Sequence, residues 1–187
     1  MTIDRARIEA AVAELLLGIG EDPARADLVD TPSRVADAYE EFFAGLGEDP
    51  LAPLAETFPV TGADSEVVAM RGIEFRSICE HHLLPFLGQA HIAYRPSDAI
   101  AGLGRLPKVV EILAARPQLQ ERLAEQIADT LVEGLHPRGV LVVLEASHQC
   151  VTTRGARQVH SSVVTVASRG EFVDGARRAE VMGLLSA

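Results

Sequence analysis

The chain has 187 residues, 48% of them hydrophobic, which is enough apolar sequence for one medium domain with a hydrophobic core. Its formal net charge of −10 excludes the overall basic character of most nucleic-acid-binding proteins, so we expect no nucleic-acid partner. A phosphorylated small molecule is compatible with this charge, because a local basic pocket is sufficient to bind it.

The first part of the chain is predicted to be helical. Residues 3–19 place apolar side chains at helical spacing, and glycines follow as stop signals. A second helix is predicted to begin with Thr31 as its N-cap and Pro32 at the first helical position, and to end at Gly45 or Gly47. Charged residues interrupt the apolar runs of the first 20 positions, so we predict neither a secretion signal nor a membrane span. We therefore expect a cytoplasmic protein without a membrane partner.

A proline-containing segment separates these helices from the rest of the chain. Residues 48–64 contain three prolines together with glycine and alanine breaks, a composition typical of a connection. We expect residues 1–50 to form an N-terminal helical extension, residues 51–64 a connector, and residues 65–187 the main domain.

From residue 65 onward the spacing of apolar residues changes. It is strand-like, then helical, then strand-like again, in the segments 66–78, 88–96, 106–117, 118–135, 139–146 and 161–170. The order strand, strand, helix, helix, strand, strand predicts an α+β fold with antiparallel pairs around a helical pair, and not a doubly wound parallel sheet.

Potential metal ligands stand at the ends of two of these predicted strands. Cys79 and His82 form a C-x-x-H pair, His148 and Cys150 form an H-x-C pair, and the chain has no other cysteine. Positions two apart on a strand share a face, so His148 and Cys150 are expected to point the same way. In a reducing compartment, shared metal ligation is favoured over a disulfide between the two cysteines. If the strand ends meet, Cys79, His82 and Cys150 could hold one ion.

Two thiolates and one imidazole form a known catalytic zinc arrangement, with the fourth tetrahedral position open to water. A structural zinc would instead take a fourth protein ligand, which His81 or His148 could supply, and spacing leaves both alternatives open. The same donors admit other metals. We expect Glu80 to face the opposite side of the strand, as a second-sphere or solvent-exposed group.

Basic residues form a second group. Arg105 and Lys108 stand at the predicted start of a helix, where free backbone N–H groups and the helix dipole favour anions. Arg154 and Arg157 follow Cys150 closely, and guanidinium groups bind phosphate through paired, charge-assisted hydrogen bonds. Taken singly, each of these charges would be an ordinary solvated residue.

With these residues in place, the chain resembles the GTP cyclohydrolase I family. The matching stretches follow the family's order and cover most of the chain: "DTPSRVADAYEEFFAG", "CEHHLLPFLGQAHIAY", "RPQLQERLAEQIAD", "ASHQCVTTRGARQ" and "SSVVTVASRGEF". The resemblance implies the tunnelling fold, in which an antiparallel sheet with two helices closes into a barrel by oligomerisation. It also implies a homo-oligomer, a decamer, with active sites at subunit interfaces.

The activity implied by the resemblance is a zinc-dependent hydrolytic opening of the guanine ring of GTP. Formate is released and the product rearranges to 7,8-dihydroneopterin triphosphate, the first step of folate and pterin biosynthesis. By resemblance, Cys79, His82 and Cys150 are the Zn²⁺ ligands, and His81 and His148 are the catalytic residues that move protons.

The resemblance assigns substrate binding to six further positions. Gln120 and Glu121 match the pair that reads the guanine edge, and basic residues match positions associated with the triphosphate: Arg34, Arg105, Lys108 and Arg154. Two positions depart from the family pattern, because Gly104 replaces a usual serine and Asp37 stands where a basic residue is common. These departures leave open a paralogue that acts on a related guanine nucleotide or stops at a ring-opened intermediate. A zinc-stabilised scaffold without catalysis is the remaining alternative.

Overall fold

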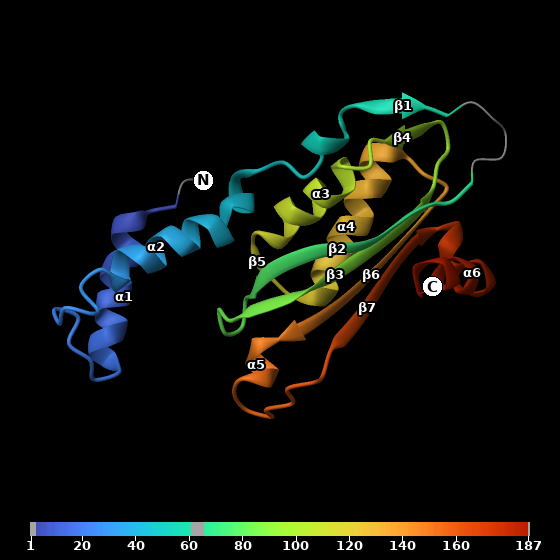
Figure 1. Ribbon diagram of the computed structural model, residues 1–187. Coiled ribbons are helices and arrows are strands. Elements are labelled where there is room, and N and C mark those ends of the chain that lie inside the picture. The colour runs from blue at the N-terminus through green and yellow to red at the C-terminus, as the bar shows by residue number, and fades with distance from the viewer. Residues whose placement is uncertain (1–2, 61–65, 187) are drawn as a thin grey trace.

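The computed structural model describes residues 3–60 and 66–186 (Figure 1). The last part of the expected connector and the expected domain boundary at residue 65 lie outside the described residues. No helix in the described ranges combines the length and the apolar character needed to cross a membrane.

The N-terminal part contains two helices packed on one another, α1 (Arg5–Gly18) and α2 (Thr31–Phe42). Helix α2 begins one residue earlier than predicted, so Asp30 occupies the N-cap position and Thr31 is already helical. It also ends at Phe42, and the short 3₁₀ helix η1 (Ala44–Gly47) follows before the chain turns. Arg5 of α1 forms ion pairs with Asp37 and with Glu40 of α2. Asp37, the acidic departure from the family pattern, therefore joins the two helices.

The main sheet has five strands in the order β5-β2-β3-β6-β7 within the described chain. The four long strands of this sheet pair antiparallel with one another, and the short strand β5 pairs parallel with β2. The strands are β2 (Val68–Cys79), β3 (Pro85–Arg95), β5 (Pro117–Gln118), β6 (Gly139–His148) and β7 (Val163–Gly170). The predicted α+β class with antiparallel pairs is confirmed.

The expected connector has structure of its own. It contains the 3₁₀ helix η2 (Ala52–Leu54) and strand β1 (Thr57–Pro59), which pairs antiparallel with β4 (Ala99–Ala101). Strand β4 comes from the segment between β3 and α3, so this pairing ties the connector to the main domain.

Helices α3 (Arg105–Ala114) and α4 (Gln120–Leu135) cover one face of the sheet (Figure 1). The predicted pair is confirmed, although residues 117–118 form β5 and not the start of the second helix. Leu123, Ile127 and Leu131 repeat every four residues and are fully buried against the sheet. Burying each such side chain stabilises the fold by roughly 1.5–3 kcal/mol. The main core therefore lies between this helical pair and the sheet.

A C-terminal helix that the sequence patterns did not predict, α6 (Gly175–Ser186), packs on the opposite face. Val181 and Leu185 form a second apolar cluster with Phe172, Leu141 and Ala93. The apolar stripe of α6 is short and most of its other residues are exposed, which explains why its periodicity is weak.

The strand register brings the candidate ligands to one end of the sheet. Strand β3 lies between β2 and β6, and its residue Phe86 pairs with Ser77 on one side and with His148 on the other. The carboxyl ends of β2 and β6 therefore meet at the start of β3, as the metal-site prediction requires.

Candidate metal centre

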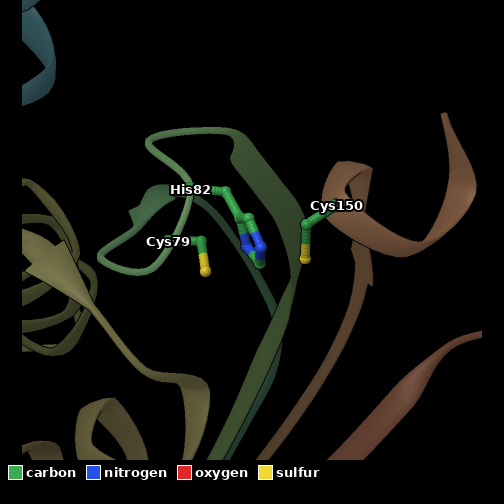
Figure 2. Close-up of side chains that lie close together, drawn as sticks. All are labelled: Cys79, His82 and Cys150. Atoms are coloured by element: carbon green, nitrogen blue, oxygen red, sulfur yellow. The ribbon is translucent and has the colours of Figure 1, made fainter. Parts of the chain in front are cut away.

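Three side chains form a group that could hold a metal ion. Cys79, His82 and Cys150 each offer one ligand atom, and these atoms all lie within 4.8 Å of one another. Figure 2 shows the His82 ring between the two cysteine side chains, which come from distant segments. The predicted grouping of these three residues is confirmed as a geometric arrangement.

The local backbone explains how His82 returns to Cys79. Cys79 is the last residue of β2; its N–H donates to the carbonyl of Leu84 (2.9 Å), and its carbonyl accepts from the N–H of Leu83 (2.9 Å). Leu83 has a φ of 51°, in the left-handed region that non-glycine residues rarely adopt. These contacts close the chain into a tight turn before β3, so His82 lies near the cysteine three residues earlier.

Cys150 reaches the site in a different way from the one the strand spacing predicted. Strand β6 ends at His148, and Cys150 lies in the short helix α5 (Gln149–Thr152). The expectation that His148 and Cys150 share a strand face is therefore wrong, because the backbone turns into a helix between them.

The donor chemistry of this group fits a cation. Burial is the main cause that raises the pKa of the Cys150 thiol, and the neighbouring Cys79 thiol raises it further, while Arg154 lowers it. A divalent cation beside the Cys150 sulfur would stabilise its thiolate form and so oppose this effect. Two sulfur donors and an imidazole suit zinc. Among the described residues, neither His81 nor His148 belongs to the group that could hold the ion.

His148 lies beside this group as a separate, partly buried imidazole. Its ring stacks on Phe86, with the ring centroids 4.6 Å apart and the planes at 3°. Burial lowers the pKa of His148, and the negative charge of Glu121 partly opposes this. The other predicted proton-moving residue, His81, is exposed and lies edge-on to His82 with the centroids 6.3 Å apart.

Gln120 and Glu121 begin α4 but differ in exposure. Gln120 is only 1% exposed, whereas Glu121 is an exposed residue. The Gln120 amide nitrogen lies 3.1 Å from the Leu144 carbonyl and 2.8 Å from the Val163 carbonyl, and its oxygen lies 2.7 Å from His148 Nε2. Glu121 is therefore free to meet a ligand, and the Gln120 amide is occupied by protein groups.

The basic residues do not all gather at the metal group within one chain. Arg154 influences Cys150 electrostatically, which places it near the ligands. The C-terminal end of α3 lies near the metal group, because the carbonyl of Ala114 accepts a hydrogen bond (2.7 Å) from Ser77 Oγ, two residues before Cys79. Arg105 is at the opposite end of this helix. Because an α-helix rises about 1.5 Å per residue, Arg105 lies roughly 14 Å along the helix axis from Ala114.

The remaining predicted phosphate residues make local ion pairs on the surface. Arg105 pairs with Glu56 (2.8 Å), Lys108 with Glu111 (3.2 Å) and Arg34 with Asp30 (3.1 Å). A Cβ at Gly104, the other departure from the family pattern, would meet no atom within 4 Å. The space that a serine side chain would use is therefore open.

Two contacts near the site had no signal in the sequence spacing. Glu80 forms an ion pair with Arg122 of α4 (2.6 Å), which links the ligand turn to the helix that carries Glu121. Phe86 covers one face of His148. Both contacts depend on how the strands and α4 pack, which residue order alone does not show.

Comparisons with known proteins identify the family of this chain. A family model described as GTP cyclohydrolase I matches residues 8–186. A protein named GTP cyclohydrolase 1 from Leifsonia xyli subsp. xyli is 62% identical over 182 residues, covering 97% of this chain and 95% of that protein. A protein of the same name from Streptococcus pyogenes serotype M49 is 49% identical over 188 residues, covering 100% of this chain and 96% of that protein. A solved structure titled as the apo form of the archaeosine synthase QueF-Like is 19% identical, with a TM-score of 0.46, over 59% of this chain and 97% of that one. The family model and the high identity over nearly full length show that this chain belongs to the GTP cyclohydrolase I family.

Proposed function

We propose that this protein is a zinc-dependent enzyme that opens the guanine ring of GTP, releases formate and forms 7,8-dihydroneopterin triphosphate. This reaction is the first step of folate and pterin biosynthesis, and we place it in the cytoplasm. The observation that carries the proposal is the group of Cys79, His82 and Cys150, with a partly buried imidazole and an exposed carboxylate beside it. Full-length similarity to proteins named GTP cyclohydrolase 1 supports the substrate.

The residues of the chain divide the work. Cys79, His82 and Cys150 would hold Zn²⁺, which would supply activation of water at neutral pH for hydrolysis of the guanine ring. Glu121, exposed at the start of α4, accepts hydrogen bonds from the ring N–H and the exocyclic amine of guanine.

Proton movement falls to the two histidines outside the ligand group. His148 donates a proton to the ring nitrogen next to carbon 8 as the imidazole ring of guanine opens. His81, which is exposed, exchanges protons during the later rearrangement of the ribose. The Phe86 ring over His148 keeps water away from one face of this imidazole.

A triphosphate carries several negative charges, so we propose that more than one basic residue binds it. Arg154 lies close enough to contribute directly. Arg34, Arg105 and Lys108 each pair with a carboxylate on the surface of their own chain, and we propose that they serve sites shared with neighbouring subunits of a homo-oligomer, a decamer. In support, β7 is an edge strand of the sheet and exposes Val164 and Val166 to pairing with another copy.

The direct test is turnover by zinc-loaded protein. We expect stoichiometric zinc, formate, and a pterin that becomes fluorescent after oxidation when GTP is supplied. Cys150→Ser should lose zinc and activity together, whereas His160→Ala, in an exposed loop, should keep both. Zinc-bound protein that is inactive on GTP, dGTP and GMP alike would overturn the proposal.

The same assay separates the alternatives. Activity on dGTP or GMP in preference to GTP would indicate a paralogue, an outcome for which open space at Gly104 is the relevant structural feature. A scaffold predicts that Cys79→Ala is mainly a stability defect, whereas the enzyme predicts that His148→Ala stays assembled and forms no pterin.

A further inference from the structure

The Gln120 side chain has its orientation determined by its surroundings. It is buried at the start of α4, and its amide nitrogen faces the carbonyl oxygens of Leu144 in β6 (3.1 Å) and Val163 in β7 (2.8 Å). The Thr165 hydroxyl lies 3.2 Å from the same nitrogen. Carbonyl oxygens can only accept hydrogen bonds, so rotating the amide would place an oxygen against two oxygens. The amide oxygen must therefore point the other way.

That oxygen meets His148. The distance between Gln120 Oε1 and His148 Nε2 is 2.7 Å, a short hydrogen bond. An amide oxygen cannot donate, so Nε2 of His148 must carry the hydrogen. In the neutral ring the unprotonated nitrogen is then Nδ1, which has no hydrogen-bond partner in the part of the chain that the structure describes.

The contacts around His148 also disfavour a flip of its imidazole ring. Phe86 is fully buried, pairs in register with His148 across β3 and β6, and stacks parallel to its ring. Turning the imidazole over would remove the Nε2 hydrogen bond and leave the buried Gln120 oxygen unpaired, which is unfavourable.

We propose that Gln120 is a positioning residue that holds His148 in the Nε2–H tautomer, so that Nδ1 is the ring nitrogen left for the substrate. This inference rests on the proposed function for the substrate, but the tautomer itself does not depend on it. Because the Gln120 amide is already occupied, reading of the guanine edge falls to Glu121.

The first experiment uses the wild-type protein. Solid-state ¹⁵N NMR of zinc-loaded protein labelled at histidine nitrogens distinguishes protonated from unprotonated ring nitrogens, and a His148→Asn sample assigns the signals. We expect a protonated Nε2 and an unprotonated Nδ1. A protonated Nδ1 on neutral His148 would overturn the proposal, whether or not the protein turns over GTP.

The second experiment separates positioning from guanine binding. Gln120→Met has a similar shape but no acceptor, so we expect a mixture of His148 tautomers. The turnover number should fall about 10-fold to 100-fold, while KM for GTP stays unchanged. This decrease in turnover number is no larger than the decrease expected when a general acid is removed. Gln89→Met, the same change at an exposed position of β3, should keep wild-type values of both.

Folding of each variant is checked by circular dichroism and zinc content. A folded Gln120→Met protein whose KM rises while its turnover number is unchanged would show direct guanine binding and contradict the proposal. If wild-type protein forms no pterin, the proposed function fails, and the NMR tautomer still decides the role of Gln120.

Discussion

Gly88→Ala is predicted to disturb both the sheet and the metal centre. Gly88 lies in β3 opposite Ala146 of β6. A Cβ at this position would be 2.0 Å from the carbonyl oxygen of Glu145 and 2.6 Å from the Cβ of Ala146. Ordinary contacts between nonbonded atoms are about 3.5–4.0 Å, so the strands would have to separate locally by roughly 1.5 Å. The atoms in the way belong mainly to the backbone, which cannot rotate aside.

The expected magnitude follows from the size of this overlap. Inserting one methyl group into a filled space destabilises a fold by about 1–3 kcal/mol. For a chain of this length each kcal/mol lowers Tm by about 2–4 °C, so the expected decrease is about 2–12 °C. The displaced part of β6 lies just before His148 and Cys150, and disturbing such supporting contacts reduces metal affinity about 10-fold to 100-fold.

Differential scanning calorimetry of the zinc-loaded protein measures the first effect, and competition with a chelator measures the second. Gly104→Ala is the matched control, because Gly104 has a φ of −65° and open space around it. We expect Gly104→Ala to change the free energy of unfolding by no more than about 1 kcal/mol, with a correspondingly small change in Tm. A Gly88→Ala protein with the Tm and chelator resistance of Gly104→Ala would refute the close approach of β3 and β6.

Two further changes test the core and the packing of α4. Burial raises the pKa of the Tyr94 hydroxyl, so the unfolded chain loses this proton first and stability is lost as pH rises above about 10. The Tyr94→Phe variant has no hydroxyl to ionise, so in urea unfolding at alkaline pH its stability should fall less than that of the wild type. At neutral pH it should be less stable than the wild type by about 1 kcal/mol, because the hydrogen bond from Ala101 N–H is lost. Parallel curves of stability against pH for the two proteins would contradict this reasoning. Arg169 of β7 pairs with Asp129 and Glu125 of α4, so Arg169→Ala should destabilise by about 1 kcal/mol, and a difference that high salt does not reduce would show that charge is not the cause.

The sequence by itself determined the elements whose burial repeats along the chain. The apolar spacing of α4 and the strand-like runs were predictable because each pattern reflects one face turned towards the core, and the two N-terminal helices were predictable from their own spacing and stop signals although they pack on one another. Helix α6 was not predicted, since it buries only a short stripe against Phe172 and neighbours from distant strands. The pairing of β1 with β4 depends on a contact across about 40 residues, which no local pattern encodes.

The metal ligands were predictable because the chain has only two cysteines and a histidine stands three residues after the first. Tertiary structure decided the rest of the site. The turn at Leu83 and helix α5 determine how the ligands meet, and the packing of α4 on β6 and β7 joins Gln120 to His148. Spacing along a chain limits which side chains share a face of one element. Hydrogen bonds between elements depend on register and packing, which only the folded chain sets.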